Sequence, residues 1–581
     1  MYKNLSTYIG LLEKEGELVR VAASVSPLLE IAEITDRVSK SPGGGRALLF
    51  ENVEGSRFPV VTNLFGSERR IAMALGAGSL DEISARLEDL LGRAFSLPRA
   101  PLAEKMKALP MLAEMSRWMP RRVRGRGECQ QTVLRGDEAR LSMLPVLKCW
   151  PHDGGRFVTL PLVHTADPVT GAPNVGMYRM QIFDDRSTGM HWHIHKTGAR
   201  HYEAHRKAGV RRMPVSVCLG GDPAYTYAAT APMPEGMDEY MLAGFLRRRP
   251  VRLVRCVTND LWVPADCDFV IEGWVDTTEP LRTEGPFGDH TGFYSLEDPY
   301  PIFHVEAITH RRDAVYPATV VGVPPQEDAW FAAATERIFL PPIRAVLQPE
   351  VCDLHMPPAG VAHNLAMVAV EAAYAGQTEK IAGALWGAGQ MMFNKVLVAV
   401  PAGFPIRDPE AVLELLRGVD PGCDLVFGHG VLDVLDHATA TSGVGGKLLI
   451  DATRASADGG GDNFEIVFDP AAEGLTPYER LWLALANIDP ARDVTARDGV
   501  MRVDARAKIS RDAGMPSRWP NVVVMDRETA GLVDRRWAEY GLGDFADSPS
   551  NRYRKLLLSD GAQAATAAAI KKSEHDPILE A

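Results

Sequence analysis

The chain has 581 residues, a formal net charge of −12 and an ordinary globular composition, with 46% hydrophobic and 24% charged residues. A length of this order exceeds what one hydrophobic core holds, so two or three domains are expected. The acidic balance argues against a sequence-independent grip on nucleic acid, which needs an excess of Lys and Arg facing the phosphates.

The seven cysteines form no CxxC pair and are odd in number, which favours neither a disulfide framework nor a zinc knuckle. A reducing cytoplasm is therefore the simplest location. Charged residues interrupt the N-terminal segment, and no apolar run approaches the roughly 20 residues that a membrane helix needs. We expect a cytoplasmic protein without a transmembrane segment, and leave an apolar substrate and peripheral membrane contact open.

Residues 1–127 are predicted to form a small α/β domain. One helix is expected over 26–38, with its N-terminus at the Ser-Pro pair, and another over 79–91, opening on a Ser/Glu capping box. Between them, short strands around a turn are expected at 46–53 and 58–65.

Residues 128–325 are dense in short strands separated by turn residues, with one helical stretch, and this texture is typical of a β-barrel or sandwich. From 326 to 525, apolar runs alternate with helical segments, which predicts another α/β domain with a partly parallel sheet. Residues 526–581 are expected to be helical with an Ala-rich end. Tails of this kind often pack on a partner subunit or fray.

Several catalytic signatures are missing from the sequence. The Gly-rich stretch 442–453 lacks the first Gly of a phosphate loop and the Ser or Thr after its Lys, and it does not fit GxGxxG. There is no HExxH motif, no GxSxG elbow and no signature of a Cys nucleophile. Hydrolase chemistry therefore has no support.

Asn174 and Arg179 are five residues apart in a predicted strand, "NVGMYRMQ". The odd separation puts their side chains on opposite faces unless a bulge at Gly176 intervenes. The alternative is that Asn174 is a turn residue and Arg179 a surface charge.

His191, His193 and His195 alternate in "MHWHIHK" and would share one face of a strand. Three imidazoles on one face can ligate a metal, and the alternative is a polar edge strand. Glu239 enters a predicted helix whose apolar residues face inward, where it is either a ligand or a partner of the helix dipole.

The segment "EGPFGDHTGFYS" (284–295) places Glu284 and Asp289 in a backbone shaped by Gly and Pro. Two carboxylates held close repel each other, so one should have a raised pKa if the site is desolvated. That would make a proton donor at neutral pH, provided an arginine keeps the other acid ionised. The alternative is an exposed acidic turn.

These segments, with "ALLFENV", "NLFGSERRIAMALG", "PMPEGMDEYMLAG" and "GGKLLIDAT", resemble the successive signatures of the UbiD-type decarboxylases, which are reversible (de)carboxylases that use prenylated FMN. The likeness runs from about residue 5 to about residue 455. It implies an α/β (α+β) fold with an N-terminal α/β part, a central split β-barrel of flavin-reductase type that binds the flavin, and a C-terminal α/β oligomerisation domain.

The resemblance also implies a cofactor phosphate held through Mn²⁺ or Mg²⁺, with K⁺ nearby. Hard cations of this kind suit phosphate and oxygen ligands. The metal ligands of the family match Asn174, His195 and Glu239, which thereby also contact the cofactor. The remaining cofactor-binding positions match Ala228, Ala229, Thr230 and Lys395.

The family's catalytic Glu–Arg–Glu/Asp triad matches Glu284, Arg179 and Asp289. In these roles Asp289 delivers the proton that replaces carbon dioxide, while Arg179 holds Glu284 ionised and orients the substrate carboxylate. Aspartate in place of glutamate shortens the donor by one methylene group. His191 and His193 match no catalytic position.

Members of the family act on aromatic, heteroaromatic or α,β-unsaturated carboxylic acids. The N-terminus and the long C-terminal extension most resemble the quinone-pathway branch, whose substrates are a dihydroxynaphthoate or a 3-polyprenyl-4-hydroxybenzoate. The resemblance further implies a flavin prenyltransferase as cofactor supplier and a homodimer or hexamer. Two alternatives are an FMN-dependent reductase on the same barrel, which would not need Glu284 or Asp289, and a non-catalytic flavin-binding module.

Overall fold

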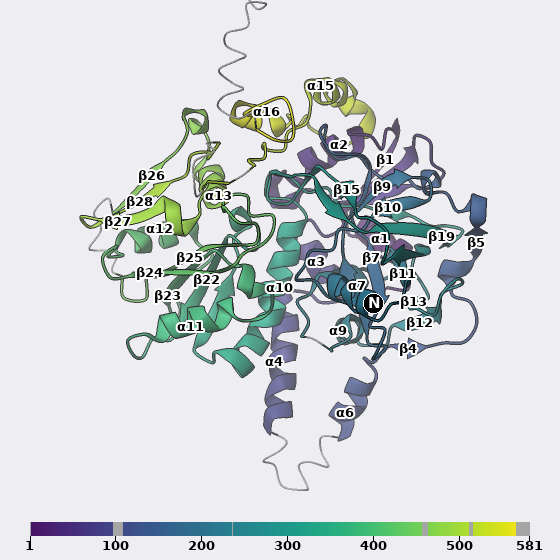
Figure 1. Cartoon of the computed structure of the whole chain (residues 1–581), viewed down its shortest axis with the longest axis horizontal. Helices are drawn as coiled ribbons and strands as arrows, with labels where there is room; N and C mark the ends of the chain where they lie inside the picture. The colour runs from purple at the N-terminus through teal and green to yellow at the C-terminus, as the bar shows by residue number, and fades with distance from the viewer. Residues whose placement is uncertain are drawn as a thin grey trace, which may run out of the picture.

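The computed structural model describes residues 2–96, 109–234, 236–455, 463–509, 515–516 and 518–564. The N-terminal and central parts, purple to teal in Figure 1, lie together on one side of the molecule, and the green C-terminal α/β part lies on the other. Helices α15 (Arg527–Arg536) and α16 (Ser550–Tyr553), in yellow, lie across the top, with α15 next to α2 (Glu30–Ser39).

A four-stranded sheet of order β1-β2-β3-β20 organises the N-terminal part. Its strands are β1 (Leu18–Val25), β2 (Ala47–Val53), β3 (Val60–Thr62) and β20 (Tyr316–Pro317). The two strands predicted from the sequence are confirmed as β2 and β3. The edge strand β20 follows the central strands in the chain and pairs in parallel with β3. No local sequence pattern indicates this pairing.

The helices of this part are α1 (Leu5–Lys14), α2, α3 (Glu68–Ala74), α4 (Leu80–Ser96) and α10 (Asp328–Pro342). The expected N-terminus of α2 at Ser26 is wrong, because Leu29 adopts a positive φ of 70° and its amide donates to the Lys148 carbonyl, so the helix begins at Glu30. A residue with that φ cannot continue a right-handed helix.

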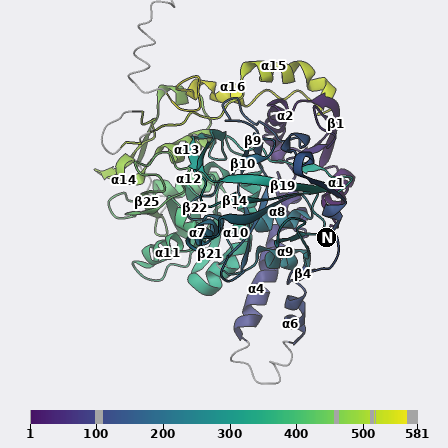
Figure 2. The same ribbon diagram turned by 45° about the vertical axis from the view of Figure 1, so that its right-hand side comes forward.

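Helices α4 and α6 (Leu109–Ser116) project away from the body, as the two views in Figures 1 and 2 show. The predicted cap of α4 is confirmed, since the Ser79 hydroxyl accepts from the Glu82 amide at 3.2 Å. The base of α4 packs on α10.

The central part is built on a curled antiparallel sheet of order β6-β9-β10-β19-β14-β11-β7-β8, with β5 also pairing with β19. Its strands are β5 (Thr132–Arg135), β6 (Phe157–Val158), β7 (Leu162–Ala166), β8 (Pro173–Met177), β9 (Met180–Asp184), β10 (Ser187–Gly189), β11 (Arg212–Leu219), β14 (Phe269–Asp276) and β19 (Ile302–His310). Among the described residues β6 and β8 do not pair with each other, so the sheet is a curled half-barrel rather than a closed barrel.

Shorter elements surround this sheet. The helices are α7 (Thr197–Lys207), α8 (Pro223–Thr230) and α9 (Glu239–Arg247). A small sheet contains β4 (Arg121–Arg122), β12 (Arg252–Arg255) and β13 (Trp262–Pro264). Two paired ribbons follow, formed by β15 (Arg282–Glu284) with β18 (Asp298–Tyr300) and by β16 (Phe287–Gly288) with β17 (Tyr294–Ser295).

The C-terminal part has a five-stranded sheet of order β21-β22-β23-β25-β24. Its strands are β21 (Val351–His355), β22 (Leu365–Val370), β23 (Val396–Pro401), β24 (Leu425–Val431) and β25 (Val444–Asp451). Strands β22, β23 and β25 are parallel and the two edges are antiparallel, which confirms the partly parallel sheet.

Helices α11 (Gln377–Trp386), α12 (Pro409–Arg417), α13 (Pro477–Asn487) and α14 (Pro490–Asp493) accompany this sheet. A second sheet contains β26 (Phe464–Val467), β27 (Val494–Arg497) and β28 (Val500–Asp504). Its core is shared with the larger sheet, because both contribute apolar residues to one cluster.

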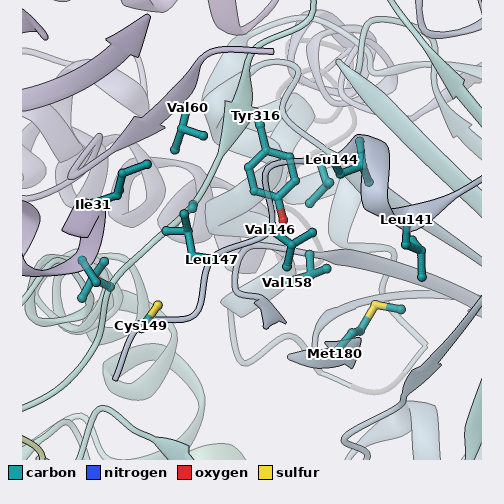
Figure 3. Packing of buried hydrophobic residues seen from close by; sticks show 14 of the residues in the cluster. Ile31, Val60, Leu141, Leu144, Val146, Leu147, Cys149, Val158, Met180 and Tyr316 are labelled. Atoms are coloured by element: carbon teal, nitrogen blue, oxygen red, sulfur yellow. The ribbon is translucent and has the colours of Figure 1, made fainter. Parts of the chain in front are cut away.

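One hydrophobic core joins the N-terminal sheet to the curled sheet. Figure 3 shows Ile31, Val60 and Tyr316 from the N-terminal part near Val158 and Met180 from the central part, and all five are buried in one cluster. Because the two sheets bury their apolar faces in one core, they form a continuous support for the loops between them.

The described part of the C-terminal tail packs on its own chain. The buried Arg37 on α2 donates to Asp534 at 2.7 Å and to the Ala546 carbonyl at 2.9 Å, and the Tyr540 hydroxyl donates to Glu30 at 2.7 Å. The described residues 526–564 are thus held against the N-terminal part of their own chain. The predicted Ala-rich end beyond 564 lies outside the described residues.

All seven cysteines are free thiols, and five of them are buried. Across the described ranges, no helix combines the length and apolar character that crossing a bilayer would require.

Candidate active site

The segment that begins at Glu284 is folded into paired strands. Glu284 ends β15 and is fully buried, while Asp289 follows β16 and is 8% exposed. The C-terminal part anchors the turn, since Trp482 donates its indole N–H to the Thr291 carbonyl at 2.8 Å, and a Cβ on Gly292 (φ 84°) would lie 2.5 Å from the Trp482 ring. The alternative of an exposed acidic turn is therefore wrong.

Arg179 joins the two acids. Its Nε and Nη2 donate to the two oxygens of Glu284 at 2.9 and 3.1 Å, and its Nη1 donates to Asp289 Oδ2. Nη2 also donates to the Ser295 hydroxyl at 3.1 Å, and the guanidinium lies 4.7 Å from the centre of the Phe287 ring. The structure thus brings together the three residues that the sequence singled out as catalytic.

A change of strand, not a bulge, brings Arg179 to this point. Strand β8 carries Asn174 and ends at Met177, and β9 starts at Met180, so Arg179 lies in the connection. The β7–β8 register is regular through Gly176, so no bulge intervenes there. The break frees Arg179 from strand alternation, and its side chain turns towards β15.

Both carboxyls of the pair have lowered pKa values. Burial alone would raise the pKa of Glu284, but Arg179 and His191 outweigh burial and lower it to about 2. For Asp289, hydrogen bonding to His290 and the charge of Arg179 likewise outweigh burial and lower the pKa. The prediction that one acid of this loop has a raised pKa is wrong for this arrangement, because cationic groups stand on both sides of Asp289.

His191 is the partner of Glu284 that the sequence analysis did not identify. Its Nδ1 lies 3.0 Å from Glu284 Oε2, and its Nε2 contacts Nε2 of His193. Burial and then Arg179 lower the pKa of His191, so a neutral ring can donate from Nδ1 to Glu284. The segment is a loop leading into α7 rather than the predicted strand, so the three histidines do not share a face.

His290 stands on the other side of Asp289. Its Nδ1 lies 3.0 Å from Asp289 Oδ1, and its ring centre lies 5.4 Å from that of His363, which comes from the C-terminal part. Burial would lower the pKa of His290, but Asp289, Asp328 and Asp433 together raise it to about 9. The adjacency of His290 to Asp289 in the sequence was the only signal that could have singled it out.

Two of the three predicted metal ligands lie side by side. The Val175 amide, next to Asn174, donates to Glu239 Oε2 at 3.0 Å, and Glu239 begins α9 as predicted. Burial raises the pKa of Glu239 to about 7. Glu239 makes no ion pair with any described residue, so a cation beside Asn174 and Glu239 would supply the missing charge.

His195 is placed differently from the other two. It is exposed, makes no hydrogen bond within the described chain, and its ring centre lies 5.9 Å from that of Phe393 in the C-terminal part. Within the described ranges, no group of three His, Cys, Asp or Glu side chains is arranged to hold a metal ion.

The predicted flavin-contacting residues fall into two places. Ala228 and Ala229, at the end of α8 beside Thr230, pack in one cluster with Val175 on β8. Lys395 instead lies fully buried in the C-terminal part, where its ammonium contacts Asp436 at 2.6 Å and the carbonyls of residues 485 and 488 at 2.7 and 3.0 Å. Three acceptors engage the three donors of Lys395.

A cavity of about 840 Å³ lies away from this cluster. Arg46, Trp330 and Trp537 are among its lining residues, so it lies between the N-terminal part and the tail, and none of the Arg179 cluster lines it. The Arg179 cluster, and not this cavity, is our candidate for the reaction site. Titratable residues that converge in one place with shifted pKa values are typical of reaction sites, whereas the volume of a cavity by itself indicates no reactive group.

The chain is similar to known proteins over most of its length. Residues 9–87, 121–324 and 329–452 match the N-terminal, Rift-related and C-terminal domains of 3-octaprenyl-4-hydroxybenzoate carboxy-lyase (UbiD). An uncharacterized protein of Aquifex aeolicus is 48% identical over 78% of this chain and 92% of its own length. One of Archaeoglobus fulgidus is 43% identical over 93% of this chain and 98% of its own.

Solved structures agree with this match. The closed form of the vanillic acid decarboxylase of Sedimentibacter hydroxybenzoicus is 25% identical with a TM-score of 0.68, covering 81% of this chain and 96% of that one. The UbiD-class enzyme HmfF of Pelotomaculum thermopropionicum, solved in complex with FMN, is 27% identical with a TM-score of 0.65, covering 81% and 99%. Since the three matched domains span more than half of the chain, the protein belongs to the UbiD family of carboxy-lyases.

Proposed function

We propose that this chain catalyses the reversible, non-oxidative decarboxylation of an aromatic or α,β-unsaturated carboxylic acid, with prenylated FMN as its cofactor. The observation that carries the proposal is Arg179, bound to both Glu284 and Asp289. HmfF, which this chain resembles, has been solved with FMN and, in an evolved dimeric form, with prFMN. Bound prenylated FMN supplies an electron sink for the electron pair left when carbon dioxide departs.

The side chains of the cluster divide the remaining work. Arg179 presents a cation that can orient the substrate carboxylate while it keeps Glu284 ionised. Asp289 gives the proton that takes the place of carbon dioxide. Burial of Glu284 and Asp289 strengthens each of these interactions, because little water competes.

Asn174 and Glu239 are the residues that would hold a divalent cation, Mn²⁺ or Mg²⁺, against the cofactor phosphate, with K⁺ nearby. Their oxygen donors and the raised pKa of Glu239 fit such an ion. His195 enters the proposal as a third ligand on the family resemblance alone. Lys395 is a weaker member of the set, because its ammonium already has three acceptors.

The curled sheet is proposed to act as the flavin-binding split barrel, with Ala228, Ala229 and Thr230 passing beneath the flavin. The proposed parts of the chain are 1–127, 128–325, 326–525 and 526–581. A role in menaquinone or ubiquinone biosynthesis, a flavin prenyltransferase as supplier, a cytoplasmic location and a homodimer or hexamer complete the proposal. The dimeric HmfF variant supports the last of these.

A flavin reductase or a non-catalytic flavin-binding module would use the same sheet. Neither needs an arginine that joins two carboxylates, each of which also contacts a histidine. The Arg179 cluster therefore favours the carboxy-lyase over both alternatives.

The decisive experiment is co-expression with a flavin prenyltransferase followed by incubation in D₂O with a panel of aromatic and acrylic acids and their decarboxylated products. We expect deuterium exchange at the product carbon for at least one pair, and carbon dioxide release from its acid. Oxidation of NAD(P)H without exchange would establish the reductase. Flavin binding with neither reaction across the panel would support the binding module.

A further inference from the structure

His290 is the second cation that Asp289 contacts, and the established family membership assigns it no role. Arg179 binds Oδ2 of Asp289, while His290 binds Oδ1 through both its Nδ1, at 3.0 Å, and its backbone amide, at 2.8 Å. An arginine stays protonated at any pH of interest, whereas an imidazole can release its proton. The Arg179 contact can therefore only hold Asp289, whereas the His290 contact can also give Asp289 a proton.

The surroundings of His290 favour its charged form. Asp328, at the start of α10, and Asp433, after β24, both raise the pKa of His290, and Asp289 does so more strongly. Facing it from the C-terminal part is His363, whose pKa burial and the charges of His290 and Lys395 lower to about 4. His290 is thus the protonated imidazole of this group at neutral pH, and its neighbour is neutral.

The histidine beside His290, His363, has no hydrogen-bond partner for its ring within the described part of the chain. It is 8% exposed, and both of its ring nitrogens lack a hydrogen-bond partner among the described residues. It follows Val361 and Ala362, two non-glycine residues with φ of 44° and 65°, a conformation that usually persists only where the surrounding structure requires it. The chain therefore holds an unpaired imidazole beside His290.

We propose that His290 stores the proton that Asp289 delivers. The inference rests on the proposed decarboxylation. In this scheme His290 is a positioning residue that acts through Asp289, the group that reaches the substrate.

The proton balance is simple. The Nδ1–H bond of His290 breaks and an O–H bond forms at Oδ1 of Asp289, leaving a neutral imidazole and a carboxylic acid. The O–H bond of Asp289 then breaks as a C–H bond forms at the carbon that has lost carbon dioxide, using the electron pair of the broken C–C bond. One proton from water recharges His290, so each turnover consumes one proton, as decarboxylation of a carboxylate requires.

The first test needs no cofactor. We would label the protein with [¹³Cε1]-histidine, titrate it by NMR, and assign the His290 signal by its loss in His290→Asn. The expected midpoint is about 9, falling by at least one pH unit in Asp289→Asn, where the main cause of the raised pKa is gone. A wild-type midpoint at or below 6.5 would overturn the inference, whatever the protein is found to catalyse.

The second test is the pH profile of the prenylated-FMN-loaded enzyme. In His290→Asn, the amide still donates to Asp289 but carries no releasable proton, so turnover at pH 7 should fall by about 100-fold. It should recover as the pH is lowered and Asp289 protonates directly. The wild type should lose activity only as the pH rises through about 9.

His304→Asn is the matched control, because His304 also pairs with a carboxylate, Glu279, at 2.6 Å, but makes no contact with the Arg179 cluster. Its pH profile should equal that of the wild type. A uniform loss at every pH in His290→Asn would overturn the storage role, since a structural defect has no reason to be repaired by acid. Failure of the wild type to exchange deuterium at all would instead overturn the proposed function, and the NMR titration separates the two.

Discussion

Arg179 and Arg37 are each paired with carboxylates inside this protein, and the surroundings of the two arginines differ. Arg179 binds Glu284 and Asp289 in the central part, and Arg37 binds Glu33 and Asp534 between α2 and the tail. Each guanidinium also lies near an aromatic ring. Burial and pairing alone therefore do not distinguish a reaction site from a structural clamp.

The difference lies in the neighbours. Arg37 donates to two backbone carbonyls as well, and burial with Asp36 raises the pKa of Glu33 despite the arginine. Around Arg179, both acids have lowered pKa values, and His191 and His290 contact them directly. Titratable groups with opposed pKa shifts in one place favour the Arg179 cluster as the proposed site of proton transfer.

The sharpest way to test this comparison is to remove Arg179. Arg179→Ala leaves two buried carboxylates without their shared cation and gives the substrate carboxylate nothing to bind. Turnover should fall by roughly 1,000-fold or more, as for other groups that stabilise developing charge. The measurement is the rate of carbon dioxide release per bound flavin. Turnover within 10-fold of the wild type would show that Arg179 is a clamp of the same kind as Arg37.

Removing Arg37 should instead affect stability. Arg37→Met leaves Glu33, which is fully buried, without its cation, and should lower the free energy of unfolding by about 3–5 kcal/mol. Urea unfolding would measure the loss, and turnover per folded molecule should not change. The double variant Arg37→Met/Glu33→Leu is the control, because it also removes the stranded charge and should recover most of the stability. A comparable loss in the double variant would contradict this account.

The variant Asp289→Asn tests whether the Asp289 carboxyl group delivers the proton that replaces carbon dioxide. The amide keeps the size of the side chain and cannot donate an acidic proton, so turnover should drop by about 100-fold while flavin stays bound. Flavin absorbance and product formation measured on the same sample give both quantities. Asp298→Asn, on the neighbouring strand β18, is the matched control. Wild-type rates in Asp289→Asn would remove the residue from the mechanism.

Glu239→Gln should give the smallest effect, and this effect should be on the retention of metal and flavin rather than on the rate of the chemical step. It removes the carboxylate charge that no cation balances in the described structure, so bound metal and flavin should both fall by about 10-fold. Metal analysis and flavin absorbance of the purified protein report this directly. Glu203→Gln, at an exposed pair on α7, is the control. His195→Ala tests the third proposed ligand, and full metal retention there would leave Asn174 and Glu239 as the protein ligands.

The sequence by itself determined the order of the parts and the chemistry available to each. Local apolar patterns located β2 and β3, and apolar runs indicated β23 and β25, because these patterns depend on residues close in the chain. The long ordered motifs identified the family resemblance, and they named Arg179, Glu284 and Asp289 before any distance was known.

Only the tertiary structure decided how those residues interact. The pKa of Asp289 depends on the neighbouring His290 and on Arg179, which reaches Asp289 from the connection between β8 and β9. The pairing of His191 with Glu284 depends on a loop, where the alternating histidines had predicted a strand. The same holds for β20 and the tail, which join the N-terminal part from distant points in the chain. Charge and packing act through space, so local spacing fixes which groups are present but not which of them holds the proton.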